Sequence, residues 1–399
     1  MTRYRYQGRD YRRAITIEDL RLMAQRALPA FSFEYLEGGA EEEITLQRNR
    51  SAFHRIGFLP RQLVKVDQVD SRTSLFGRPL SQPLIVSPTG FNGMLWPGAD
   101  SALARLAAEK GFISVLSTAS SDSIEQVAAA TAHVPDARRW FQLYMLTQSG
   151  ITEQLIARAH QAGCEALVLT TDTVCIGNRE WDRRNFARPQ VLTLRRKLEV
   201  LRHPRWMLRT MFPHGLPSFG NIDEYLPPEN RTAQGGAHYL STYMARDLDW
   251  HTVDWLRKQW PGKLLLKGIL RVDDGEKAID HGVDGLIISN HGGRQLDGAV
   301  SPLEALPGFV ERFKGRLPLL LDGGVRRGTD IAKAVALGAD AVMGGRALLY
   351  GVAAGGAEGA AHAHQILYTE LVRTLGQLGC ARLDQLCREH LQLPADFAV

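Results

Sequence analysis

The sequence predicts an α/β protein built as a single (β/α)8 barrel, with an N-terminal helical cap and a long insertion after the fourth strand. From residue 83 onward, eight short apolar segments alternate with amphipathic helical patterns. The apolar segments are nearly continuous, which indicates strands buried on both faces, as in a parallel sheet covered by helices. A doubly wound open sheet is the main competitor, but the sequence has neither GxGxxG after the first strand nor GxxxxGK[ST].

The barrel elements follow one another in regular order. The predicted strands are PLIVSPTG (83–90), FISVLSTAS (112–120), WFQLYML (140–146), ALVLTTDT (166–173), KLLLKGI (263–269), GLIISN (285–290), PLLLDGG (318–324) and AVMGGRAL (341–348). Helical patterns follow the strands, for example over 99–111, 150–163, 271–282 and 327–339, and several end on a glycine that favours a helix C-terminus. We expect a helical cap over residues 1–60, with helices around 16–28 and 33–38, a barrel over 61–390, and within it an insertion over 174–249.

The composition is that of a soluble globular protein, with 44% hydrophobic and 23% charged residues among 399. The net charge of +5 is concentrated, because residues 177–220 hold ten Lys or Arg and three acidic residues. This charge is too mild to predict nucleic-acid binding. The four cysteines lack the spacing of a zinc site, so we expect no metal and free thiols in a reducing cytoplasm. No apolar segment follows the basic N-terminus, so we expect neither a signal peptide nor an anchor.

Function is expected at the C-terminal ends of the strands, where barrel active sites lie. The seventh and eighth predicted strands end in DGGVRRG and GGR, which bring glycine amides together with Arg326 and Arg346. Solvated arginines beside tight glycine turns are one interpretation. We favour a phosphate site, because barrels commonly bind phosphate after these two strands.

Three further side chains have open interpretations. Lys267 ends an otherwise apolar strand, where it forms a structural salt bridge, neutralises a cofactor or substrate, or makes a Schiff base. Tyr35 and Tyr144 can each present a hydroxyl group, although packing alone explains a tyrosine in an apolar segment equally well.

An acid–base pair with a neighbouring cation is also predicted. His291 can act as a general base, and Asp172 at the end of the fourth strand can orient it and favour its imidazolium form. Arg294, three residues after His291, can bind a carboxylate through two hydrogen bonds. Together these residues indicate an acid substrate that has a proton to lose.

Several separate motifs then resemble the FMN-dependent 2-hydroxy acid dehydrogenase and oxidase family: SNHGGRQLDG, LDGGVRRGTD, WFQLY, TTDT, LKGI and EYLEGGAEEE. The likeness extends from about residue 15 to residue 390, with the motifs in the order that the family has them. The members of the family that oxidise mandelate are the most similar, through YLEGGAE, PTGFNGMLWP, LSTAS and HPRW.

The resemblance implies a role for each site residue. His291 is implied to be the base, paired with Asp172, while Lys267 lies against the flavin and stabilises its anionic reduced form. The implied substrate residues are Arg294 and Arg179 for the carboxylate, assisted by Tyr35, with Tyr144 at the substrate hydroxyl. The implied FMN residues are Pro88, Thr89, Ser117, Gln142, Thr170 and Ser289 along the ring and ribityl chain, and Asp322, Gly324, Arg326, Gly345 and Arg346 at the ribityl chain and phosphate.

Two departures from the short-chain oxidases bear on the substrate. Ala119 stands where glycolate oxidase has a tryptophan, and Gly90 stands in place of an alanine. Smaller side chains leave room for a larger substituent, so the resemblance favours an aromatic (S)-2-hydroxy acid such as mandelate, oxidised to the 2-keto acid. Lactate is the alternative. Both a carbanion route and a hydride route need His291, and the sequence does not choose between them.

The basic insertion interleaves cations with large apolar residues in LRRKLEVLRHPRWMLRTMFPHGLP, a composition typical of interfacial membrane segments. A solvated lid with a basic face is the alternative. The resemblance implies peripheral contact with the inner face of the cell membrane, a quinone as electron acceptor, and a homotetramer. An oxidase would instead use oxygen and need no membrane. A barrel that binds FMN as a sensor without turnover would lack His291 or Arg294, and both are present.

Overall fold

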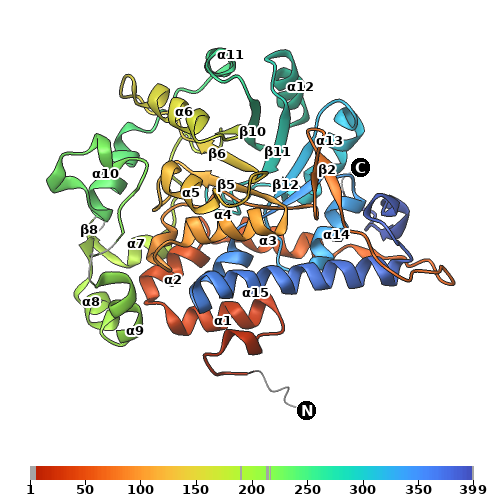
Figure 1. Ribbon diagram of the computed structural model, residues 1–399, viewed down its shortest axis with the longest axis horizontal. Coiled ribbons are helices and arrows are strands. Elements are labelled where there is room, and N and C mark those ends of the chain that lie inside the picture. Colours follow the sequence, from red (N-terminus) through yellow and green to blue (C-terminus); the bar gives the residue numbers. More distant parts are fainter. Residues whose placement is uncertain (1–5, 189–190, 213–214, 216, 398–399) are drawn as a thin grey trace.

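The computed structural model describes residues 6–188, 191–212, 215 and 217–397, and its centre is a closed barrel of eight parallel strands (Figure 1). The strands are β4 (Leu84–Val86), β5 (Ile113–Ser117), β6 (Arg139–Leu143), β7 (Ala166–Thr170), β10 (Lys263–Ile269), β11 (Gly285–Ser289), β12 (Leu319–Asp322) and β13 (Ala341–Gly344). The helices that follow them are α4 (Ala99–Lys110), α5 (Ile124–Thr131), α6 (Ile151–Gln161), α11 (Trp250–Gln259), α12 (Val272–Asp280), α13 (Pro302–Phe313), α14 (Gly328–Ala336) and α15 (Arg346–Leu378). The predicted (β/α)8 barrel is confirmed.

Most strands end earlier than their apolar segments suggested, so several predicted site residues lie in the loops that follow. Tyr144 and Asp172 lie one and two residues beyond their strands, and Arg346 begins a helix. Parts of the expected cap and insertion, at residues 1–5, 189–190, 213–214 and 216, lie outside the described residues.

Alternation along the strands decides which side chains fill the barrel. The inward-facing apolar cluster consists of Ile85, Ile113, Val115, Trp140, Ala166, Val168, Leu265, Ile287, Leu320, Ala341 and Met343. The hairpin β2 (Thr73–Leu75) and β3 (Arg78–Leu80) packs Leu75, Phe76 and Leu80 onto this cluster. Two residues further along the strands, the same alternation brings polar side chains inward at the C-terminal end: Ser117, Gln142, Thr170, Lys267, Ser289 and Asp322.

Three helices precede the barrel, namely α1 (Ile17–Ala27), α2 (Ala30–Glu37) and α3 (Ile44–His54), after the short η1 (Tyr11–Arg13). α1 runs beside α15 (Figure 1). A capping box formed by Thr16 and Asp19 begins α1. The sequence analysis predicted α1 and α2 but missed α3, which starts after Glu43 in a left-handed conformation without a side-chain cap and therefore carries no capping signal.

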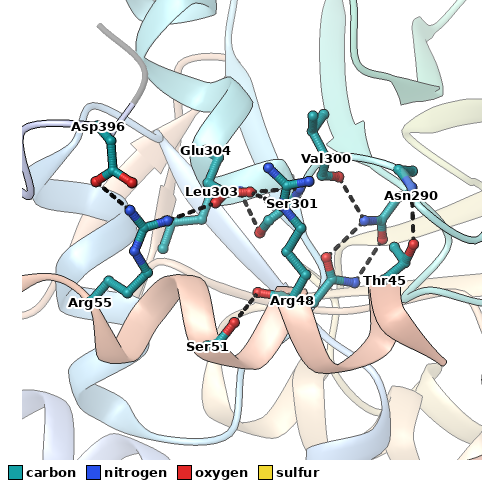
Figure 2. Close-up of polar contacts among 12 residues, drawn as sticks. Thr45, Arg48, Ser51, Arg55, Asn290, Val300, Ser301, Leu303, Glu304 and Asp396 are labelled. Carbon is teal, nitrogen blue, oxygen red and sulfur yellow. Dashed lines mark hydrogen bonds and ion pairs between the residues drawn. The ribbon is translucent and has the colours of Figure 1, made fainter.

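α3 fixes the loop that follows β11 (Figure 2). Asn49 and Asn290 exchange two buried hydrogen bonds between their amide groups, of 2.8 and 2.7 Å. Arg48 binds Glu304 of α13 at 2.7 Å, and the hydroxyl oxygen of Thr45 accepts a hydrogen bond from the backbone of the same loop. The loop that begins at Asn290 is therefore held rigidly over the end of the barrel.

The insertion between β7 and α11 has its own short elements, which the sequence analysis did not predict. They are α7 (Glu180–Arg184), β8 (Phe186–Arg188), β9 (Val191–Leu192), α8 (Leu194–Val200), α9 (Pro204–Trp206), the π-helix η3 (Met207–Met211), η4 (Asp223–Tyr225), η5 (Pro228–Asn230) and α10 (Ala233–Tyr243). Buried Trp206 donates a hydrogen bond of 2.9 Å to the carbonyl oxygen of Met94, in η2 (Asn92–Met94) after β4. This hydrogen bond holds the insertion against the loop that follows β4.

The C-terminal segment returns to the start of the barrel, where β14 (Leu391–Gln392) pairs with β1 (Gly57–Phe58) after the short helices η6 (Leu383–Gln385) and η7 (Arg388–His390). Within the described ranges, no helix has both the length and the apolar character needed to cross a bilayer.

Candidate active site

A cavity of about 1260 Å³ lies over the C-terminal ends of the strands. The predicted site residues that line it are Tyr35, Pro88, Thr89, Gly90, Ser117, Ala119, Tyr144, Arg179, Lys267, His291, Arg294, Asp322, Gly324, Arg326, Gly345 and Arg346. The remaining predicted residues lie behind these. Gln142, Asp172 and Ser289 are each hydrogen-bonded to a lining residue, and Thr170 is buried at the end of β7.

His291 and Asp172 form a pair at the cavity wall. Nδ1 of the histidine lies 2.8 Å from Oδ1 of the aspartate, which leaves Nε2 as the ring nitrogen available to a ligand. Burial would raise the pKa of Asp172, but the charge and hydrogen bond of His291 and the nearby Lys267 hold that pKa below its ordinary value. The carboxylate is therefore charged and can stabilise a protonated imidazole.

The backbone of His291 is left-handed, with φ of 59°, a conformation that a non-glycine residue adopts at an energetic cost. The backbone N–H of His291 donates a hydrogen bond of 3.0 Å to the hydroxyl oxygen of Ser289. This contact, together with the hydrogen bonds between Asn49 of α3 and Asn290, holds the backbone of His291 in place beside the cavity.

Lys267 and Asp322 form a buried ion pair, with Nζ 2.9 Å from Oδ2. Burial would neutralise both groups, but each holds the other charged: the pKa of the lysine is raised by Asp322 and Asp172, and the pKa of Asp322 is lowered by Lys267. Ser289 accepts from the lysine at 3.1 Å and donates to the carboxylate at 2.8 Å, while Ser87 donates to its other oxygen at 2.8 Å. Ser87 was missed by the sequence analysis, although its place two residues beyond Ile85 is a signal that it faces inward.

A second group of cations surrounds Tyr35. The guanidinium carbons of Arg294 and Arg179 lie 5.2 and 5.6 Å from the centre of its ring. Burial, together with repulsion from Arg179 and Arg346, lowers the pKa of Arg294 to about 9. Among the described residues Arg294 binds two carbonyl oxygens and no carboxylate, so an anion in the cavity would relieve its desolvation.

The end of the cavity formed by β12 and β13 has the shape expected of an anion site. Gly324 has φ of 81°, and a Cβ there would lie 2.1 Å from the carbonyl oxygen of Asn49, so no other residue fits. Arg326 is buried and lines this end. Arg346 donates hydrogen bonds from three of its five N–H groups to the carbonyl oxygens of Leu36, Gly38 and Gly292. It therefore also joins α2 to the loop of His291, a contact that the sequence did not predict.

Gly90 and Ala119 face each other on the loops after β4 and β5. A Cβ on Gly90 would lie 3.1 Å from both the Cβ and the carbonyl oxygen of Ala119. Beside them Phe91 stacks on Phe219 of the insertion at 4.7 Å and meets Tyr35 edge-on at 6.3 Å. The pocket therefore combines two very small residues with an aromatic wall.

Comparison with known proteins identifies the class. The family model described as FMN-dependent dehydrogenase matches residues 24–393. The chain is 42% identical over 377 residues to (S)-mandelate dehydrogenase of Pseudomonas putida. The aligned region covers 94% of this chain and 93% of that protein. The chain is 39% identical over 384 residues to an L-lactate oxidase of Nostoc sp., covering 95% and 98%. The solved structure of the monotopic membrane protein (S)-mandelate dehydrogenase superposes with a TM-score of 0.89 at 41% identity, covering 96% of this chain and all of that one.

The barrel and these likenesses define an oxidoreductase that acts on 2-hydroxy acids. The chain belongs to the FMN-dependent dehydrogenase family. It is an FMN-dependent 2-hydroxy acid dehydrogenase similar to (S)-mandelate dehydrogenase, which confirms the resemblance found in its motifs and the expected cofactor.

Two buried polar atoms test whether the residues fit FMN. Nε2 of Gln142 and Oγ1 of Thr170 have no hydrogen-bond partner among the described residues. They lie at the inward-facing ends of the neighbouring strands β6 and β7. A buried polar group without a partner costs about 1–3 kcal/mol, and the oxygen and nitrogen atoms along the edge of a flavin would supply the missing partners. The site therefore fits the cofactor that the family requires.

Replacing Thr170 by Val tests this fit. We expect FMN to bind about fivefold more weakly, because one neutral hydrogen bond contributes about 1 kcal/mol. The FMN-free protein should lose no stability, since the hydroxyl has no protein partner to lose. Fluorescence titration of FMN and urea unfolding of the FMN-free protein measure the two quantities.

Thr171→Val is the matched control, because its hydroxyl does have a protein partner, the carbonyl oxygen of Lys267 at 3.0 Å. It should lower the free energy of unfolding and leave FMN affinity unchanged. The opposite pattern for Thr170→Val, a destabilised protein with normal FMN affinity, would show that its hydroxyl serves the fold.

Proposed function

We propose that the enzyme oxidises an aromatic (S)-2-hydroxy acid such as mandelate to the corresponding 2-keto acid. The observation that carries the proposal is the pair Gly90 and Ala119 on the cavity wall, where neither residue extends a side chain beyond Cβ, beside the aromatic wall of Phe91 and Phe219. A phenyl ring would gain both room and stacking partners there. The 42% identity to a protein named (S)-mandelate dehydrogenase supports the same substrate.

The charged residues suggest how the acid is oriented. Its carboxylate would lie beside Arg294, which binds no carboxylate among the described residues, with Arg179, already paired with Asp182 at 3.2 Å, as a second cation nearby. Tyr144 keeps its proton, because burial, with Asp172 and Tyr35 nearby, raises the pKa of its phenol well above the ordinary value. It can therefore donate a hydrogen bond to an oxygen of the substrate.

Proton removal would then fall to Nε2 of His291. Asp172, charged and 2.8 Å from Nδ1, would stabilise the imidazolium that forms. Bound FMN supplies the acceptor for two electrons. The remaining FMN contacts would come from Pro88, Thr89, Ser117, Gln142, Thr170 and Ser289 along the ring and ribityl chain, and from Asp322, Gly324, Arg326, Gly345 and Arg346 at the ribityl chain and phosphate. Lys267 would place its positive charge beside the ring.

Lactate is the second candidate substrate, because the chain is also 39% identical to a protein named L-lactate oxidase. In that case a smaller acid would leave the space beside Gly90 and Ala119 unused, and oxygen could serve as electron acceptor. We favour the larger acid, since an unfilled apolar space gives a ligand no contacts.

The acceptor we propose is a membrane quinone, reached by docking the insertion on the inner face of the cell membrane. The segment exposes several large apolar side chains: Leu194, Leu198, Leu201, Leu208 and Phe212. Cations lie among them at Arg195, Lys197, Arg202 and Arg205. The structural relative described as a monotopic membrane protein supports this contact. A homotetramer would place several such segments on one membrane, which strengthens binding through multivalency.

The histidine base is tested by His291→Ala. The variant should still bind FMN, but the rate of flavin reduction by the acid without oxygen should fall by about 100-fold to 10,000-fold, the usual contribution of a positioned base. Stopped-flow absorbance measures this rate. His281→Ala is the matched control, because His281 forms a similar pair with Asp254, at 2.6 Å, outside the cavity. Normal reduction by His291→Ala would refute the assignment.

Membrane docking is tested by the double substitution of Leu198 and Leu208 by Asp, at side chains that are 58% and 68% exposed. Binding to anionic vesicles should weaken at least tenfold in sedimentation assays, since burying each leucine contributes about 1.5–3 kcal/mol. Flavin reduction by the acid should be unchanged. Deleting the whole segment would be less informative, because Trp206 supports the loop after β4.

Leu63→Asp serves as control for the membrane test. Leu63 is fully exposed. The segment between β1 and β2, to which it belongs, lies on the opposite side of the molecule from α8 (Figure 1). This variant should bind vesicles normally. Equal binding by all three proteins would contradict a docking role for the insertion.

A further inference from the structure

Asp100, in the first turn of α4, is a buried carboxylate that connects the two loops bearing Gly90 and Ala119. Its Oδ1 accepts a hydrogen bond of 2.7 Å from the amide of Asn92, in the loop after β4. Its Oδ2 accepts hydrogen bonds of 3.0 and 3.2 Å from the backbone N–H groups of Ser121 and Asp122, in the loop after β5. One side chain, 6% exposed, therefore binds both loops.

These contacts reach almost to the cavity wall. The side-chain amide nitrogen of Asn92 lies 2.8 Å from the hydroxyl oxygen of Thr89 and 3.2 Å from the carbonyl oxygen of Thr89. Thr89 directly precedes Gly90 in the chain. On the other loop, Ser121 lies two residues after Ala119, and its hydroxyl oxygen accepts a hydrogen bond of 3.0 Å from the backbone of Gly93. The chain of contacts runs from Thr89 through Asn92 and Asp100 to the second loop.

A simple helix-capping role does not account for this arrangement. Within the first turn of α4, the backbone N–H of Ser101 donates to Asp122 at 2.8 Å, so another carboxylate performs the capping. Both oxygens of Asp100 point instead to groups outside its own helix.

The insertion supports the same loops, but from separate residues. Trp206 binds the carbonyl oxygen of Met94 on the first loop. Asn221 donates to the carbonyl oxygen of Ser117 at 3.1 Å and to the hydroxyl of Ser120 at 2.9 Å on the second. Neither of these side chains bonds to both loops, whereas Asp100 does.

We propose that Asp100 is a positioning residue that sets the distance between Gly90 and Ala119, and thereby the size of the substituent that the pocket accepts. The inference rests on the proposed function, in which this pair makes room for an aromatic ring. The loops meet through a backbone hydrogen bond of 2.8 Å from Phe91 to Ala119, and a Cβ on Gly90 would already be 3.1 Å from Ala119. The two loops are therefore in close contact, and a change in their separation alters the part of the cavity wall that Gly90 and Ala119 form.

Asp100→Asn tests the proposal, because it replaces one acceptor oxygen by an N–H donor. If the new amide keeps the two backbone N–H groups, its nitrogen faces the donor of Asn92, which must turn over and release Thr89. We expect the ratio of kcat/KM for (S)-mandelate to that for L-lactate to change about tenfold from the wild type, mainly through KM for mandelate, with kcat within about threefold.

Direct binding gives a second readout that does not depend on turnover. The dissociation constants of phenylacetate and acetate, acids without a hydroxyl group to oxidise, are measured through the absorbance of bound FMN. In Asp100→Asn the constant for phenylacetate should change about tenfold, and that for acetate should stay within about twofold. A variant that was only less stable would bind both acids equally well once folded.

Three further variants complete the test. Asp122→Asn changes a neighbouring carboxylate that accepts a hydrogen bond from the backbone of Ser101, and it should keep the wild-type ratio. Asn92→Ala removes the hydrogen bond between Asn92 and Asp100 from the side of the first loop, so it should reproduce the effect of Asp100→Asn. It also tests this contact if Asp100→Asn does not fold. The double variant should be no worse than either single variant, because both remove one connection.

The proposal is overturned if folded Asp100→Asn or Asn92→Ala keeps the wild-type ratio and the wild-type affinity for phenylacetate. It is also overturned if affinity for acetate changes as much as affinity for phenylacetate. A wild type that prefers lactate would refute the aromatic substrate alone, since the change in ratio caused by Asp100→Asn would still be measured against that wild type.

Discussion

The buried ion pair of Lys267 and Asp322 is the interaction on which the rest of the site depends. Two charges removed from water are stable only when each has its partner and its remaining hydrogen bonds. Ser87 and Ser289 supply these bonds, and together the four residues join the ends of β10, β11, β12 and β4. Because Ser289 also accepts a hydrogen bond from the backbone of His291, the left-handed conformation of that histidine is anchored to the same pair.

The barrel and the segments around it contribute different residues to the cavity. The strand ends and the loops directly after them supply the charges, the His291–Asp172 pair and the unpartnered polar groups that fit FMN, and their positions follow from the closed geometry of the sheet. The parts outside the barrel shape the substrate side, since Tyr35 comes from α2, and Arg179 and Phe219 come from the insertion. Chemistry common to the family can thus remain fixed while the choice of acid and of membrane contact changes.

Much of this arrangement could be predicted from the sequence, because burial on both faces leaves a clear apolar pattern in parallel strands and alternation then points Lys267 and Asp322 inward. The motifs identified the family and its cofactor. The sequence could not show that Lys267 meets Asp322, since that contact joins β10 to β12 across the intervening strand β11. Nor did it reveal α3, which lacks a capping signal, or the connection through Asp100, whose partners are mostly backbone N–H groups of distant loops.

The central claim is that this pocket oxidises an aromatic 2-hydroxy acid. The most direct test mixes the purified FMN-bound protein with (S)-mandelate or L-lactate in the absence of oxygen and follows the flavin absorbance. We predict rapid bleaching by mandelate and much slower bleaching by lactate at equal concentration. Rapid bleaching by lactate alone would contradict this prediction and would assign the enzyme to the smaller acid.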